Sequence, residues 1–111
     1  YSDATLPVTG WSKVGTTYTH VAGTANTLSF ALSLPAGNYI LHVTATITAG
    51  TLDFGTDEIG APIQLSGAGV QSSTVEFYST GIGTALTCIP SSDFVGSFTE
   101  ANIYIQNVIY S

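Results

Sequence analysis

The sequence predicts an all-β fold, and three observations support that prediction. Turn signals built from Gly, Pro, Asn and Asp recur along the chain, separated by runs of roughly five to twelve residues. Several of these runs alternate apolar and polar residues, as strands with one buried face do. The composition is 44% apolar and only 7% charged, and Thr, Ser, Gly and Asn supply most of the polarity. Thr-rich, β-branched chains suit pleated surfaces better than helices.

Four strands are expected in the first half of the chain, each next to a turn signal: 10–14, 16–22, 26–34 and 38–49. Alternation is clear in the third strand, where Leu28 and Phe30 share one face. In the second strand Tyr18 and His20 share a face opposite threonines, so we expect a hydrogen-bonded, half-buried histidine and not a metal ligand. In the fourth strand, His42 is expected to face outward among threonines.

Five further strands are expected in the second half: 51–54, 62–66, 70–80, 84–89 and 97–109. Cys88 is the only cysteine, so there is no internal disulfide, and its place in an alternating strand predicts a buried, inert thiol. Alternation in the last strand turns Asn102, Tyr104 and Gln106 to one face and Ile105 to the other. About eight or nine antiparallel strands in one domain, 1–111, is the size of a jelly-roll β-sandwich.

Net charge excludes several classes of partner. The chain carries −6 at pH 7, and Lys13 is its only Lys or Arg. Nucleic-acid binders need several basic side chains to displace counterions from phosphates, so DNA and RNA are not expected as partners. Binding to an anionic membrane is disfavoured for the same reason. No signal peptide and no apolar run of membrane-spanning length is visible, so no membrane insertion is expected.

Catalytic and metal-binding patterns are weak in this sequence. No Gly-x-Ser-x-Gly elbow occurs, and the two histidines lack metal-ligand spacing. Asp53, Asp57 and Glu58 lie close together, and such carboxylates bind Ca²⁺ or, in pairs, hydrolyse glycosides. Their spacing matches no calcium-binding loop, so the alternative is a solvated acidic loop. We expect no enzyme activity, no metal site and no cofactor.

Aromatic residues give the main candidate for ligand binding: Trp11, Tyr18, Tyr78, Tyr104 and Tyr110. Tyr78 and Tyr104 look outward by alternation, and Asn102 and Gln106 are polar residues close to Tyr104 in sequence. Flat exposed rings combine apolar area with a polar handle, which suits stacking on sugars. The alternative is that Trp11 is core and the tyrosines line a subunit contact, where tyrosine is also enriched.

Two stretches carry a family resemblance: Gly10-Trp11-Ser12 with Gly15 to Gly23 and Thr27 to Phe30, and Leu86 to Phe98, which contains Pro90-Ser91-Ser92-Asp93-Phe94-Val95-Gly96-Ser97. Together they resemble the carbohydrate-binding-module-like, galactose-binding-like jelly rolls of bacteriophage tail-fibre, head-fibre and decoration proteins. The structural motif comprises Trp11, His20, Pro90, Asp93, Phe94 and Gly96. We expect Asp93 to bond local backbone amides and Phe94 to plug the end of the sandwich. Gly96 should supply a backbone angle that other residues resist.

The resemblance implies a non-catalytic virion module outside the cell that attaches to a surface glycan or to neighbouring virion subunits. Some relatives hold a structural calcium with an Asp where this chain has Thr99, which argues against calcium here. The apolar last strand, with Ile105, offers a surface for a homotrimer. Two alternatives stay open: a carbohydrate-binding module of a secreted bacterial glycosidase, and a purely structural capsid or tail spacer.

Overall fold

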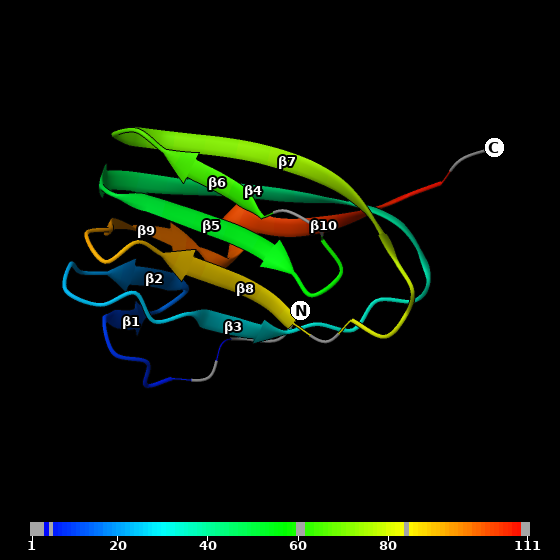
Figure 1. Cartoon of the computed structure of the whole chain (residues 1–111), viewed down its shortest axis with the longest axis horizontal. Helices are drawn as coiled ribbons and strands as arrows, with labels where there is room; N and C mark the ends of the chain where they lie inside the picture. The colour runs from blue at the N-terminus through cyan, green and yellow to red at the C-terminus, as the bar shows by residue number, and fades with distance from the viewer. Residues whose placement is uncertain (1–3, 5, 60–61, 84, 110–111) are drawn as a thin grey trace.

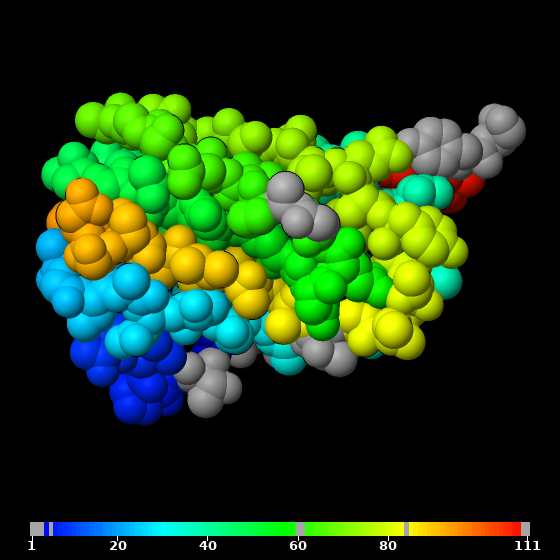
Figure 2. Space-filling view, in the orientation of Figure 1, coloured from blue at the N-terminus to red at the C-terminus, as the bar shows by residue number. Residues whose placement is uncertain are grey.

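The chain forms two antiparallel sheets packed face to face (Figure 1). The computed structural model describes residues 4, 6–59, 62–83 and 85–109. One sheet holds β1 (Trp11–Val14), β2 (Thr17–His20), β4 (Gly37–Ala49), β7 (Gly69–Ser79), β9 (Val95–Thr99) and β10 (Ile103–Val108). The other holds β3 (Leu28–Ala31), β5 (Thr51–Thr56), β6 (Ile63–Ser66) and β8 (Ala85–Pro90). Figure 2 shows the face built by this second sheet.

The strand order confirms the predicted jelly roll. In the first sheet β2, β9, β4 and β7 lie side by side, and in the second the order is β3-β8-β5-β6. The chain therefore crosses repeatedly from one sheet to the other, as two interleaved Greek keys require. β1 adds to the edge at β2, and β10 pairs with β4.

The last predicted strand, 97–109, is wrong in one respect. A short 3₁₀ helix, η1 (Glu100–Asn102), divides it into β9 and β10, so the described residues contain ten strands and not eight or nine. The side-chain oxygen of Asn102 accepts hydrogen bonds from the backbone N–H of Thr99 (2.9 Å) and from its hydroxyl (3.1 Å). This local bonding competes with strand geometry, which is how Asn interrupts regular structure.

The break lets one strand pair with two others along the same edge. β4 pairs with β10 over residues 38–43 and with β9 over 46–49, with a register shift between Ile47 and Ala49. Along its opposite edge β4 pairs with the whole of β7. Consequently β10, β4 and β7 form a three-stranded surface whose outer face points away from the core.

The core lies between the sheets and follows the predicted alternation. Its buried apolar members are Trp11, Tyr18, Leu28, Phe30, Leu32, Tyr39, Leu41, Val43, Ala45, Ile47, Leu52, Phe54, Ile63, Leu65, Phe77, Leu86, Cys88, Phe94, Phe98 and Ile103. Aromatic rings link the two layers: Phe98 on β9 meets Phe54 on β5 edge-to-face, with ring centroids 5.5 Å apart. Such pairs add to the free energy gained by area burial.

His20 is more deeply buried than predicted. Its side chain has no exposed area, and its Nδ1 lies 2.7 Å from the carbonyl oxygen of Phe94. The predicted hydrogen bond is therefore confirmed, and since a carbonyl only accepts, Nδ1 carries the proton. Trp11 packs edge-on against the imidazole at a centroid distance of 4.9 Å, as part of the core.

The turn that follows β8 confirms one expectation of the motif and corrects another. Phe94 is fully buried, as expected of a residue that plugs the end of the sandwich, and its N–H donates to Ser91 O (3.0 Å). The Asp93 carboxylate accepts from the Ser91 hydroxyl (2.6 Å), in place of the backbone amides that we expected. Pro90 is buried and is the last residue of β8, where it pairs with Leu52 of β5.

Gly96 is required for a reason other than the one predicted. It is not among the glycines with positive φ, so its backbone angle is open to other residues. A Cβ at this position would instead collide with the carbonyl oxygen of Thr46 and lie 2.7 Å from Cζ of Phe94. The close approach of β9 to β4 therefore excludes any side chain at Gly96.

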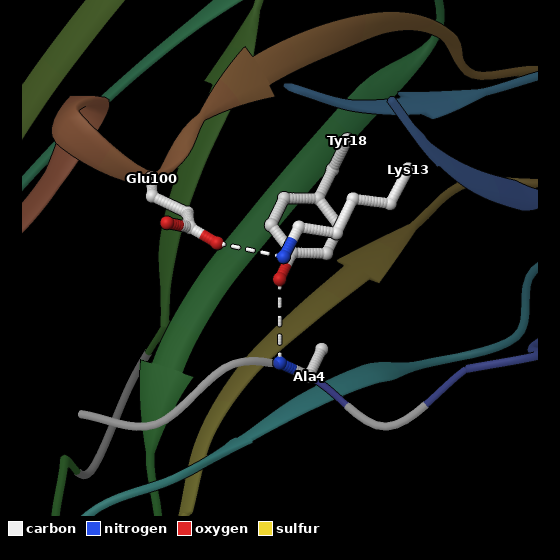
Figure 3. A network of polar contacts seen from close by, with 4 residues as sticks. All are labelled: Ala4, Lys13, Tyr18 and Glu100. Atoms are coloured by element: carbon white, nitrogen blue, oxygen red, sulfur yellow. Dashed lines mark hydrogen bonds and ion pairs between the residues drawn. The ribbon is translucent and has the colours of Figure 1, made fainter. Parts of the chain in front are cut away.

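The chain's one lysine is part of the framework (Figure 3). Lys13 Nζ lies 2.9 Å from a carboxylate oxygen of Glu100 and 5.2 Å from the ring centroid of Tyr18. The Tyr18 hydroxyl accepts a hydrogen bond from the N–H of Ala4 (3.3 Å). These contacts tie the start of the chain to β1, β2 and η1.

The apolar side of the last strand faces inward. Ile103 is buried and Ile105 packs, half-buried, against the core. Ile105 is thus a core contact and not a free surface for the homotrimer considered from the sequence. An Ile105→Asp substitution would report on folding before it reported on assembly.

Candidate functional site

The outer face of β10, β4 and β7 carries rows of paired side chains. Paired residues of neighbouring strands point to the same side of a sheet. One row runs from Tyr104 on β10 through His42 on β4 to Thr74 on β7. The next row, two residues further along each strand, places Gln106, Ile40 and Glu76 side by side.

The first row contains a stacked pair of rings. The His42 and Tyr104 rings lie with centroids 4.3 Å apart and planes 12° apart. Tyr104 keeps 53% of its surface exposed in this arrangement, whereas His42 is half-buried. The Nε2 atom of His42 lies 3.2 Å from Oε1 of Gln106, which holds the imidazole in place along the sheet. The pair therefore forms an ordered aromatic platform on the protein surface.

A shallow depression of about 490 Å³ adjoins this platform. Its lining comprises His42, Val43, Thr44, Ser72, Ser73, Thr74 and Tyr104. The hydroxyl groups of Thr44 and Ser72 lie 2.8 Å apart, one donating to the other, and each keeps further hydrogen-bonding capacity. The lining of the depression thus combines the rings of His42 and Tyr104 with neutral hydroxyl groups.

Two of the four predicted ligand-binding residues meet at this platform. Tyr104 and Gln106 do so, as adjacent members of the outward face of β10. Tyr78 is exposed (57%) on the same face, but its register partner is Asn38, four residues along β4 from His42. That offset separates Tyr78 from the Tyr104 row by roughly 13 Å. Asn102 is engaged in the capping of η1.

Several residues of the platform were not identified from the sequence as ligand-binding candidates. His42 was expected to point outward, which the structure confirms, but its contact with Tyr104 was not foreseen. Thr44, Ser72 and Thr74 are not singled out by the sequence, and the structure places all three in the lining of the depression. Their meeting depends on the registers of β4 with β7 and β10, which alternation within one strand does not fix.

A carboxylate lies beside the platform. Glu76 lies in the neighbouring row and is exposed. Lys13 is on β1, where it pairs with Glu100. The chain's only Lys or Arg is therefore engaged on β1 with a carboxylate from η1 and not on the platform.

The acidic segment begins in β5 and continues into a solvent-accessible turn, where its last two carboxylates accept hydrogen bonds from a neighbouring segment. β5 extends to Thr56, so Asp53 lies within a strand. Glu58 accepts hydrogen bonds from the N–H of Thr80 (3.0 and 3.1 Å) and from the Thr80 hydroxyl. The bond from that hydroxyl is the main reason that the pKa of Glu58 lies below its ordinary value. Asp57 accepts from the N–H of Ala85 (3.4 Å), so both carboxylates join the chain after β5 to the chain after β7.

Three further expectations from the sequence concern Cys88, metal binding and Tyr110. Cys88 is fully buried, as predicted, and burial raises the pKa of its thiol well above the ordinary value. Within the described ranges, no three His, Cys, Asp or Glu side chains gather closely enough to hold a metal ion. Tyr110, and Thr84 at the start of one predicted strand, lie outside the described residues.

No family model matches the chain, and no curated protein matches its sequence. Across the part of the chain that the structure describes, no helix is long and apolar enough to cross a membrane.

Proposed function

We propose that this domain is a non-catalytic binding module that holds a neutral glycan on the outer face of β10, β4 and β7. The observation that carries the proposal is the stacked His42–Tyr104 pair beside a depression lined with hydroxyl groups. An ordered aromatic surface next to neutral hydrogen-bonding groups matches the two sides of a sugar. The C–H groups of a pyranose ring pack on an aromatic face, while its hydroxyls need donors and acceptors.

The chemistry of each residue follows from its position. Tyr104 supplies exposed aromatic area, and His42 covers one face of its ring, so the side chain is already ordered before a ligand arrives. Gln106 offers an amide N–H₂ while its oxygen faces His42. Thr44, Ser72 and Thr74 offer hydroxyls that both donate and accept.

A shallow site of this kind binds a single ligand weakly, so we propose that the domain acts in many copies. Linked copies raise the effective concentration and turn weak contacts into strong attachment. The resemblance to fibre and decoration domains of bacteriophage virions supplies that setting, with host-surface glycan or neighbouring virion subunits as partners. A module of a secreted glycosidase would use the same platform, and a flanking catalytic domain in the full polypeptide would identify it.

A glycan array probed with the multivalently displayed domain tests the proposal. We expect binding to a restricted set of neutral glycans and at least a tenfold loss of signal with Tyr104→Ala. Ile89→Ala is the control, because it removes an exposed apolar side chain from β8, on the opposite sheet and away from both the platform and β7. Multivalent display holds the valency constant between variants. A folded wild-type domain without any glycan signal, or full binding by Tyr104→Ala, would overturn the proposal and favour a structural spacer.

A further inference from the structure

We propose that a second copy of this chain pairs with the outer edge of β7, antiparallel and about a two-fold axis at Thr74. The two sheets would then join into one continuous sheet, with both platforms on the same side. Three features of β7 support this proposal: an open edge, a symmetric arrangement of exposed apolar side chains, and the position of the platform row.

The first feature is the unprotected edge of β7. This strand pairs with β4 in unbroken register from Gly69, opposite Ile47, to Ser79, opposite Gly37. Within the described part of the chain no strand lies along its other edge, and in Figure 1 it forms the margin of the molecule. Proteins usually protect such edges with proline, bulges, short strands or charges. β7 has eleven residues, no proline and a single charged residue, Glu76.

The second feature is symmetry about the middle of the strand. Thr74 is the central residue of β7, and Val70 and Tyr78 each lie four positions from it. Both are large apolar residues left exposed, at 69% and 57%. In a two-fold antiparallel pair centred on Thr74, Val70 of one copy lies opposite Tyr78 of the other, on the same face of the sheet. Glu76 then lies opposite Ser72, so like charges do not face each other.

The third feature concerns the binding platform. The row Tyr104–His42–Thr74 ends on the proposed axis, because Thr74 is its member on β7. In the dimer the row of one copy meets the same row of the other copy at the axis. The strand order across the joined sheet is then β10-β4-β7-β7-β4-β10. Five strand spacings then separate the two Tyr104 side chains, a span of roughly 24 Å. This joined surface, which rests on the proposed function, fits an oligosaccharide chain better than a single sugar.

Disulfide trapping tests the dimer without any ligand. Directly opposed residues of an antiparallel pair have Cα atoms about 4.5–5.5 Å apart, within the range of a disulfide. Thr74→Cys should therefore cross-link rapidly to a second copy under mild oxidation. Ser72→Cys is the matched control. In this register residue 72 of one copy lies four positions along the strand from residue 72 of the other, a Cα separation of roughly 13 Å. The wild type, with only buried Cys88, should not cross-link.

The proposal stands if Thr74→Cys forms disulfide dimers at least tenfold faster than Ser72→Cys, with both variants folded as judged by circular dichroism. Equal rates, or no cross-linking of Thr74→Cys, would overturn it. Sedimentation of the wild type adds a second readout. We expect concentration-dependent dimers that Val70→Asp weakens at least tenfold, and a wild type that stays monomeric at millimolar concentration would also overturn the proposal.

The joined platform has a test of its own. The Thr74→Cys protein is compared in its oxidised and reduced forms, so that the same substitution is present in both. We expect an oligosaccharide identified on the array to bind the oxidised dimer at least tenfold more tightly per chain. Equal affinity would overturn the joined platform while leaving the dimer in place.

A second comparison leaves Thr74 unchanged, so it decides the question even if Thr74→Cys itself abolishes binding. At concentrations where the wild type is dimeric, Val70→Asp should bind the same oligosaccharide at least tenfold more weakly. Val70 lies outside the residues that line the depression, so a weaker monomer site is not expected from this change. Equal binding by a monomeric Val70→Asp and a dimeric wild type would overturn the joined platform.

Discussion

The Nδ1 atom of His20 donates a hydrogen bond of 2.7 Å to the carbonyl oxygen of Phe94, seventy-four residues later in the chain. This bond joins β2 to the turn before β9 inside a core that excludes water. We expect His20→Ala to lower the free energy of unfolding by about 3 kcal/mol, because it leaves a buried carbonyl unpaired and opens a cavity. Denaturant unfolding measures the change. Thr19→Ala, on the outer side of β2, should stay within about 0.5 kcal/mol of wild type, and similar losses in the two variants would contradict this role.

Gly96 should be far less tolerant than Gly15. Gly96→Ala places a Cβ against the backbone of β4 and the ring of Phe94, which we expect to cost about 3 kcal/mol. Gly15 has φ of +61°, but a methyl group added there would meet nothing within 4 Å, so Gly15→Ala should cost only about 1 kcal/mol of backbone strain. Thermal or denaturant unfolding of both variants compares the two effects. Equal costs would show that the close approach at Gly96 is not what requires glycine.

Much of this fold could be predicted from the sequence, because alternation is local information. Leu28 and Phe30 are buried on one side of β3, as their spacing indicates. The division of the last strand at η1 could not be predicted in the same way. There the hydrogen bonds that Asn102 makes to Thr99 prevail over an alternating pattern that continues through the break.

The candidate site was only half predictable, since it depends on long-range register. Tyr104 and Gln106 follow from the alternation of one strand. The contact between His42 and Tyr104 joins residues from β4 and β10 that only the pairing of those strands brings together. Shifting either strand by one residue would turn one of the rings into the core.

Stability should depend on pH through Glu58. The hydrogen bond from the Thr80 hydroxyl lowers the pKa of this carboxyl in the folded state. A lowered pKa adds stability that is present above the pKa of the unfolded chain and is lost as the pH falls through the lower, folded value. Glu58→Gln should therefore reduce the melting temperature at pH 7 and lose that effect at pH values below the folded pKa.

Thr80→Val provides the matched test, because it removes the hydroxyl that donates to the Glu58 carboxylate. We expect the double variant to melt close to Glu58→Gln alone at pH 7, because the hydroxyl that Thr80→Val removes then no longer donates to a carboxylate. Fully additive effects would contradict this role of the Glu58–Thr80 hydrogen bond. So would a melting-temperature difference between Glu58→Gln and wild type that stays the same size as the pH is lowered until the carboxyl is protonated.

The platform should prefer neutral glycans to those that carry a carboxylate. The chain has net charge −6, and Glu76 occupies the row next to His42. An anionic sugar would be repelled, and salt would screen that repulsion. We expect about tenfold weaker binding of a carboxylated glycan than of its neutral counterpart at low ionic strength. Glu76→Gln should reduce this difference in affinity. Isothermal titration at two salt concentrations measures this, and tighter binding of the acidic glycan would contradict it.

The most direct test of the glycan platform is an NMR titration of isotopically labelled protein with the neutral oligosaccharides that give the strongest array signals. We expect amide and ring shifts to concentrate along Tyr104, His42 and Thr74, to extend to Gln106, and to disappear with Tyr104→Ala. Shifts centred on the face of β3, β8, β5 and β6, or no shifts at the platform at millimolar oligosaccharide, would contradict a binding role for the His42–Tyr104 pair.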